Sequence, residues 1–143
     1  MDTIEALRAE IAALRRDVYL DPLTELGNRR LLEERTSGRG GYFVAIDLND
    51  FKRVNDLLGH AYGDDVLRNF ARHLLVHAGV GDRVACRVGG DEFTVWCPSR
   101  ESAEVMLRKV WAWSCAGVTA SAGIGATKEL ADARARENKR NKR

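Results

Sequence analysis

The chain has 143 residues, the length of one domain, because two complete hydrophobic cores would need a longer chain. Hydrophobic residues make up 45% and charged residues 31% of the sequence, which excludes an intrinsically disordered chain. The formal net charge is only +2, yet the final stretch RARENKRNKR holds six basic side chains against one acidic one. The C-terminus is therefore strongly basic although the chain as a whole is not.

The cysteines and the apolar runs bear on disulfides, on a zinc site and on membrane association. Cys86, Cys97 and Cys115 are odd in number, widely spaced and without a CxxC pair. This pattern excludes a disulfide framework and a cysteine zinc site, and it predicts reduced, mostly buried thiols. The N-terminus is charged, and no apolar run is long enough for a signal peptide or a membrane span. We therefore expect no membrane association and a cytoplasmic location.

The first predicted element is a helix over residues 1–20. Ile4, Leu7, Ile11, Leu14 and Val18 recur at alternating spacings of three and four, which is the a/d seam of a short coiled coil. Isoleucine and valine at the a positions favour two strands. The pattern therefore predicts a dimerising helix. The alternative is a single amphipathic helix that docks on its own domain.

The rest of the chain alternates between helical and strand patterns. In chain order, the segments after the DPLTELGNRR break predict a helix in NRRLLEER, a strand in GYFVAIDL, helices in FKRVNDLL and GDDVLRNFARHLLVHA, strands in DRVACRV and FTVWC, a helix in RESAEVMLRKVWAW, a strand in GVTASAGIGA and a polar final helix in KELADARARENKRNKR. This order predicts an α+β fold, with a mixed sheet flanked by helices in a ferredoxin-like arrangement.

The stretch RVGGDEF is the candidate site. If the strand that ends at Asp47 lies beside the hairpin, Asp47 and Asp91 reach the same rim, and their carboxylates repel each other unless a cation lies between them. Carboxylates with a backbone carbonyl form the hard-oxygen set that Mg²⁺ takes. Gly89 and Gly90 allow a backbone or a substrate to approach closely. Lys52 and the free N–H groups of the next helix suit phosphates. The pattern favours a nucleoside triphosphate with a metal, although a Gly-Gly turn can also be purely structural.

Five blocks together resemble the GGDEF family of diguanylate cyclases, from Asp21 to the last residue: DPLTELGNRR, DLNDFKRVNDLLGHAYGDDVL, RVGGDEF, VTASAGIG, and AD followed by NKRNKR. The resemblance implies a nucleotidyl-cyclase-like fold with a catalytic domain over residues 21–143. It implies that two GTP molecules condense into cyclic di-GMP with release of pyrophosphate. It also implies a homodimer that binds one GTP per subunit, and the predicted dimerising helix over residues 1–20 would supply that pairing.

The resemblance also implies roles for individual residues. Metal binding, by Mg²⁺ or Mn²⁺, falls to Asp47, the carbonyl of Leu48, Asp91 and Glu92. Catalysis falls to Asp91, Glu92 and Lys52. Substrate binding falls to Phe51, Lys52, Asn55, Asp64, Gly89, Gly90, Lys139 and Arg143. A carboxylate at position 64 can accept from the N1–H and amino group of guanine, which favours GTP over ATP. The alternatives are a helix C-cap at Asn55 and an N-cap at Asp64.

Several departures from the family leave other functions open. Asn49 stands where the family has a second acid, the segment before the final helix is short, and Ala135 and Arg136 replace the usual Leu-Tyr. A truncated, inactive module that binds GTP, cyclic di-GMP or a protein partner is therefore the main alternative. A coiled-coil protein that binds nucleic acid through its basic tail is the other, and nucleic acid is not the expected partner. With no sensor domain ahead of the helix, control is expected through dimerisation, expression or a partner.

Overall fold

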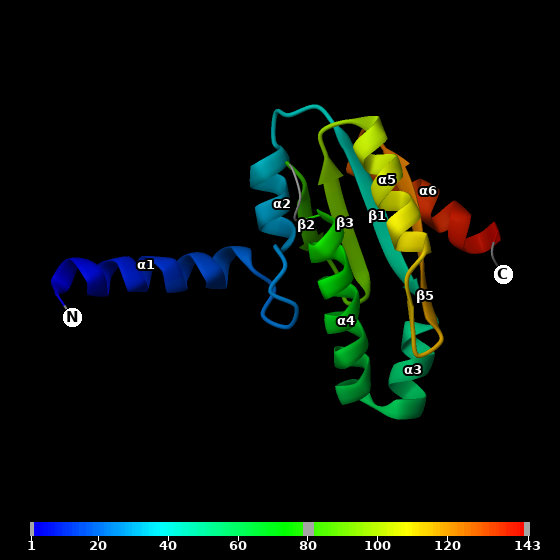
Figure 1. The fold of residues 1–143 in the computed structure, drawn as a ribbon, viewed down its shortest axis with the longest axis horizontal. Coiled ribbons are helices and arrows are strands. Elements are labelled where there is room, and N and C mark those ends of the chain that lie inside the picture. Colours follow the sequence, from blue (N-terminus) through cyan, green and yellow to red (C-terminus); the bar gives the residue numbers. More distant parts are fainter. Residues whose placement is uncertain (1, 79–81, 142–143) are drawn as a thin grey trace.

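The computed structural model describes residues 2–78 and 82–141 (Figure 1). The helices are α1 (Thr3–Tyr19), α2 (Arg29–Thr36), α3 (Phe51–Leu58), α4 (His60–Ala78), α5 (Arg100–Trp111) and α6 (Lys128–Asn141). The strands are β1 (Tyr42–Asn49), β2 (Val84–Arg87), β3 (Glu92–Cys97), β4 (Ser114–Cys115) and β5 (Val118–Gly125). The predicted order of helices and strands is confirmed, and the short strand β4 is added to it.

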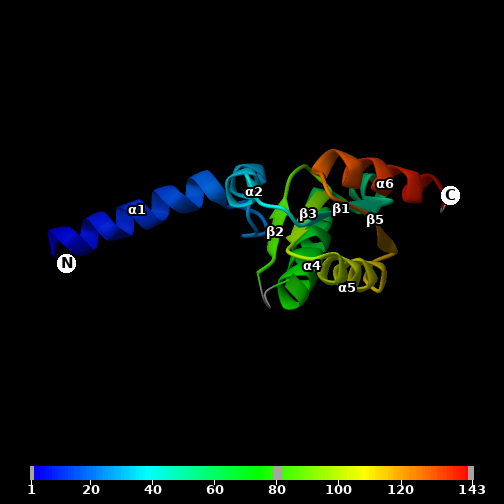
Figure 2. The same ribbon diagram turned by 90° about the horizontal axis from the view of Figure 1, so that it is seen from above.

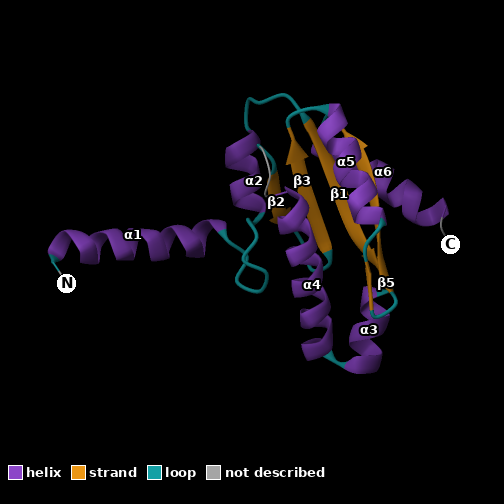
Figure 3. Ribbon diagram, in the orientation of Figure 1, coloured by secondary structure: helices purple, strands orange, loops and turns teal. Residues whose placement is uncertain are grey.

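The strands form one sheet in the order β2-β3-β1-β5-β4. Figure 3 shows β2, β3, β1 and β5 side by side. The α+β, ferredoxin-like prediction is confirmed, but the expected mixed sheet is wrong, since every pair of named strands is antiparallel. The helical crossovers do join parallel strands, β1 to β2 and β3 to β5. In each case another strand lies between the two, as in a split βαβ unit. Among the described residues, parallel pairing is limited to an isolated bridge between Gly27 and Cys86.

The two faces of the sheet carry different helices (Figure 2). Because side chains alternate along a strand, Val44, Ile46 and Leu48 of β1 point into the main core with α4 and α5. On the opposite face Ala45 packs with Ala131 and Ala135 of α6. The face that Ala45 shares with Asp47 is therefore partly covered by the final helix, and this placement decides what surrounds the acidic rim.

The final helix docks on β5 at two glycines, despite the short connection before it. A Cβ on Gly123 would lie 2.4 Å from the backbone nitrogen of Ala135, and a Cβ on Gly125 would lie 2.5 Å from that of Ala131. The helix backbone thus approaches the strand closely where the side chains are missing. This contact holds α6 across β5 and β1.

We expect Gly123→Ala to destabilise the domain by about 1–3 kcal/mol, because the added methyl group must push the α6 backbone away from β5. Urea unfolding followed by circular dichroism measures the change. Gly40→Ala is the matched control, because a Cβ there meets nothing within 4 Å. Equal midpoints for the two variants would contradict the close packing of α6.

Helix α1 projects away from the domain (Figures 1 and 2) and buries none of its residues. Its seam is open to solvent, with Ile4 61%, Leu7 52% and Leu14 56% exposed. Asp2 caps the helix by accepting a hydrogen bond from the Glu5 N–H at 2.9 Å. The alternative of a helix docked on its own domain is therefore wrong. Across the described ranges, neither α1 nor any other helix combines the length and apolarity that a membrane span requires.

The cysteines are free, as predicted. Cys86 and Cys97 are buried and Cys115 is half-buried. Burial raises the pKa of the Cys86 thiol to about 12, so this side chain stays protonated and unreactive at neutral pH.

Candidate nucleotide and metal site

The predicted acids meet at one rim because the hairpin tip folds onto the end of β1. Asp47 pairs with Glu92 in the antiparallel register, which places both side chains on the α6 face of the sheet. The N–H of Leu48 donates a hydrogen bond to the carbonyl of Asp91 at 3.2 Å. The structure thus brings Asp47 and Leu48 together with Asp91 and Glu92. The two pairs belong to separate motifs that lie 40 or more positions apart in the sequence.

This rim carries more negative charge than its cations balance. Burial, followed by the charge of Asp47, raises the pKa of Asp91, and Glu92 adds to the effect. The positive charge of Lys139 lowers the pKa of Asp91 and so acts against this rise. The Nζ of Lys139 lies 3.0 Å from Asp47 Oδ2, and this contact places the side chain of Lys139, from α6, at the rim. An additional cation at the rim would relieve the remaining repulsion.

The donors at the rim fit a hard divalent cation in part. In the described part of the chain no three acidic, histidine or cysteine side chains converge as a ready metal site. A cation would therefore need the carboxylates of Asp47 and Asp91, the carbonyl of Leu48, and oxygen atoms of the substrate or of water. Such a mixed shell is usual for Mg²⁺, which is bound by one or two carboxylates and by substrate phosphates. The donor set fits Mg²⁺ or Mn²⁺ only together with a phosphate ligand.

Arg87 holds the hairpin tip in place. Its Nε and Nη2 donate to the Gly90 carbonyl at 3.0 and 2.8 Å. Its Nη1 donates to both carboxylate oxygens of Asp21, at 3.2 and 3.3 Å. Inside the turn, the N–H of Val88 donates to the carbonyl of Glu92 at 2.9 Å. One guanidinium therefore joins the Gly-Gly turn to the segment where α1 enters the domain.

Asp21 is held in its charged form. Burial alone would raise its pKa, but hydrogen bonds from the hydroxyl and N–H of Thr24 and the charge of Arg87 outweigh burial and lower the pKa below its ordinary value. A lowered pKa in the folded state adds stability at every pH above the unfolded value of about 4, and this stability is lost as the pH falls through the folded value.

We therefore expect Asp21→Asn to cost about 1 kcal/mol of unfolding free energy at pH 7, and the cost to shrink at an acid pH below about 4, as the folded-state carboxyl takes up its proton. Urea unfolding at the two pH values measures this. The control is Asp65→Asn, which removes an exposed ion pair with Arg68 and should change stability little at either pH. A cost for Asp21→Asn that is equal at both pH values would contradict the assigned ion pair.

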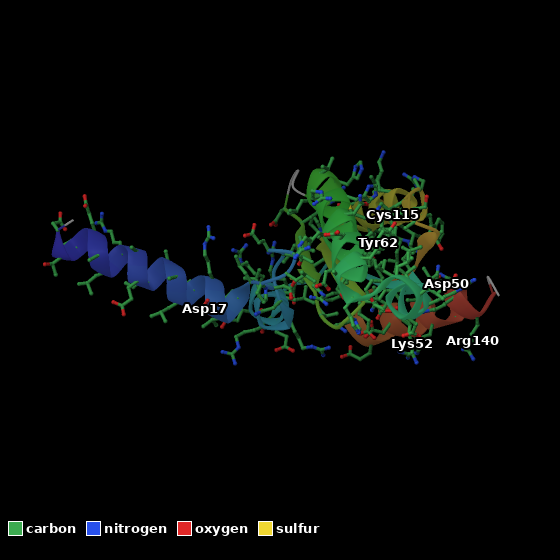
Figure 4. All side chains as sticks on the ribbon, turned by 90° about the horizontal axis from the view of Figure 1, so that it is seen from below. Asp17, Asp50, Lys52, Tyr62, Cys115 and Arg140 are labelled. Atoms are coloured by element: carbon green, nitrogen blue, oxygen red, sulfur yellow. The ribbon has the colours of Figure 1, made fainter. Side chains whose placement is uncertain are left out.

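The start of α3 provides free N–H groups close to the end of β1. Asp50, the N-cap residue, has a left-handed backbone (φ 63°, ψ 17°), and its side chain makes no capping hydrogen bond. A non-glycine residue in this conformation is strained, and such strain is common at functional sites. Figure 4 labels Asp50 and Lys52 beside α3, and Lys52 is exposed. The first turn of α3 therefore keeps the donors and the positive charge that were predicted for phosphates.

The corner between α3 and α4 gathers the residues predicted to contact the base. Asn55 lies against Gly63, where a Cβ would sit 1.7 Å from Asn55 Oδ1, and Asp64 follows directly. The Oδ1 atom of Asn55 is buried and has no hydrogen-bond partner among the described residues. The capping alternatives are wrong, because Gly59 is the C-cap of α3 and α4 already begins at His60. Both side chains are thus left for another partner.

The other predicted residues have mixed placements. Phe51 is buried in the main core, so its side chain packs rather than faces a ligand. A Cβ on Gly89 would lie 3.0 Å from Glu92 Oε2, whereas Gly90 faces open space. Arg143 lies outside the described residues.

Sequence reasoning missed two sets of contacts at the site. It gave no role to Arg87 or Asp21, whose partnership spans 66 positions and leaves no local signal. It treated Asn49 only as a departure. The Nδ2 of Asn49 donates to Thr119 Oγ1 at 3.0 Å and its Oδ1 accepts from Ser121 Oγ at 2.9 Å, so a neutral amide ties β1 to β5 at the rim.

The fold and the site first define a class, a ferredoxin-like α+β domain with an acidic hairpin tip beside a helix N-terminus. The family model described as "Diguanylate cyclase, GGDEF domain" matches residues 18–137. The chain belongs to the GGDEF domain family.

Several known proteins are similar to this chain. Diguanylate cyclase DgcP of Pseudomonas aeruginosa is 34% identical over 85% of this chain, and diguanylate cyclase VdcA of Vibrio cholerae is 31% identical over 75% of it. The chain spans only 21% and 34% of the lengths of these relatives. The solved coiled coil and GGDEF domain of DgcB from Caulobacter crescentus, in complex with c-di-GMP, is 27% identical with a TM-score of 0.80, covering 98% of this chain and 90% of that chain.

Proposed function

We propose that this protein is a diguanylate cyclase that condenses two GTP molecules into cyclic di-GMP with release of pyrophosphate. The observation that carries the proposal is the meeting of Asp47, Asp91 and Glu92 with Lys139 at the hairpin tip. Carboxylates that repel each other are retained where they bind a cation, and a cation there can hold a polyphosphate. The diguanylate cyclases among the relatives support the same reaction.

In this proposal the chain holds GTP from three sides. Lys52 and the first-turn N–H groups of α3 bind the terminal phosphate, because a helix N-terminus attracts anions. The exposed turn at Gly90 lets the nucleotide approach the backbone. Asn55 and Asp64 bind guanine at the α3–α4 corner, where the unpartnered Oδ1 of Asn55 gains a donor. Phe51 supports the corner from within the core.

Diguanylate cyclases generally use divalent metal ions. Here Asp47, Asp91 and the Leu48 carbonyl would hold Mg²⁺ or Mn²⁺, which stabilises charge that develops on the phosphates during transfer. Glu92 is exposed at the start of β3. It either joins the metal ligands or accepts the proton of the attacking 3′-hydroxyl. Lys139 neutralises the rim until substrate arrives and then turns to the phosphates.

The proposed enzyme works as a homodimer. Each catalytic domain, residues 21–143, holds one GTP, and each 3′-hydroxyl attacks the α-phosphate on the other subunit. The helix over residues 1–20 supplies the partner, because its exposed a/d seam can pair with a second copy and raise the effective concentration of the second half-site. We place this activity in the cytoplasm, where GTP is available.

Incubation of the purified protein with GTP and Mg²⁺ tests the proposal. Cyclic di-GMP and pyrophosphate, separated by chromatography, are expected in a ratio of one to two. ATP in place of GTP is the control for base choice and should give no cyclic product. Binding of GTP with no product at high protein concentration would contradict the cyclase and support the alternative, an inactive nucleotide-binding module.

A further inference from the structure

A pocket of about 170 Å³ lies between the acidic rim and the final helix. Asp47 and Glu92 line it from the sheet, and Asp132 and Arg136 line it from α6. Ala135 is also part of its wall, and this small side chain leaves space between the helix and β1. The pocket therefore adjoins the predicted metal ligands and contains a basic residue to which the sequence assigned no role.

The charges in this pocket single out Arg136. Asp47 is paired with Lys139 at 3.0 Å and Asp132 with Lys128 at 2.9 Å. Within residues 2–78 and 82–141, Arg136 makes no ion pair or hydrogen bond through its side chain, and it is exposed. Positions 136 and 139 are three apart, so both side chains lie on one face of α6. Arg136 thus lines an acidic pocket and has no ion-pair or hydrogen-bond partner for its guanidinium among the described residues.

We propose that Arg136 is a further substrate-binding residue, which contacts the polyphosphate chain of GTP. This inference rests on the proposed function. A metal-bound polyphosphate carries several oxygen atoms, and a guanidinium offers planar N–H donors that bind phosphate oxygens as a pair. Lys139 provides a point charge one turn further along the same face. The two basic side chains hold the phosphates from the α6 side, opposite Lys52 on α3.

Binding of a non-hydrolysable GTP analogue and of GMP, measured by calorimetry with Mg²⁺, tests this inference. Arg136→Ala should weaken binding of the triphosphate analogue about tenfold and leave GMP binding unchanged, because the lost hydrogen bonds are to the outer phosphates. Arg136→Lys should recover part of the loss. Arg108→Ala removes the same charge from the exposed end of α5, on the other face of the sheet, and should bind like wild type.

Each outcome decides a separate claim. Equal affinity of wild type and Arg136→Ala for the analogue would overturn the role of Arg136 and leave the proposed function intact. An equal loss for the analogue and for GMP would also overturn it, since the effect would then not come from the outer phosphates. Failure of wild type to bind the analogue would overturn both. Unchanged circular dichroism is expected for Arg136→Ala because the side chain is exposed.

Discussion

Asp91→Asn is expected to reduce cyclic di-GMP formation by roughly 10²–10³-fold, because a neutral amide replaces one of the two carboxylates proposed to hold the metal at the phosphates. The same substitution should stabilise the metal-free domain at neutral pH. The pKa of Asp91 is raised by burial and by Asp47, so the folded domain loses stability as the pH rises through that raised value, and asparagine avoids the loss. An increase of about 1–3 °C in the unfolding temperature corresponds to somewhat less than 1 kcal/mol.

Two measurements separate these effects. Product formation by chromatography reports on catalysis, and thermal unfolding with and without Mg²⁺ and GTP reports on binding. Ligand should raise the unfolding temperature of wild type much more than that of Asp91→Asn. Asp65→Asn, on the exposed side of α4, is the control and should match wild type in both measurements. A fully active Asp91→Asn variant would remove Asp91 from the proposed site.

Leu7→Glu with Leu14→Glu is expected to convert the proposed dimer into a monomer and to lower the rate of the proposed cyclase reaction at micromolar protein by at least about tenfold. These leucines occupy the d positions of α1 and are 52% and 56% exposed, so they contribute nothing to the core of their own domain. Buried carboxylates at adjacent d layers would repel in a two-stranded coil. Light scattering after gel filtration gives the mass, and activity across protein concentrations gives the dependence on association.

The matched control places the same charge off the seam. Ala9 lies at an f position of the heptad that starts at Ile4, so Ala9→Glu should keep both the proposed dimer and the proposed activity. The unfolding of the domain itself should be unchanged in all variants, since α1 buries no residue. A charged seam that still dimerises would show that α1 is not what pairs the subunits. A monomer with full activity at low concentration would show that the activity does not require the dimer.

The placement of Asp47 illustrates what could be predicted. A nearly continuous apolar run that ends in an acid predicts a buried strand with a carboxylate at its end, and β1 has this form. The Gly-Gly turn followed by acids likewise predicts the hairpin tip. What could not be predicted is that Asp47 pairs with Glu92 and lies within reach of Lys139. Strand register and helix docking depend on contacts between segments that are distant in the sequence.

Arg87 and Arg136 illustrate the opposite case. The sequence assigned neither arginine a role at the site, yet one holds the hairpin tip to Asp21 and the other lines the pocket beside the acids. The direction of the strands was also mispredicted, because a split βαβ unit has the same order of elements as a mixed sheet. In the split unit another strand lies between the two parallel strands, whereas in a mixed sheet the two parallel strands can pair directly.

The sequence by itself determined the elements, the family and the identity of the acids, because hydrophobic period and turn residues are local properties and the motifs are continuous in the chain. The tertiary structure alone decided that the sheet is antiparallel, that helix α1 is exposed and that α6 approaches the rim. Those features depend on burial and on close backbone contact, as between Gly123 and Ala135. Such contacts join residues that are distant in the sequence, and no local sequence pattern indicates which residues will meet.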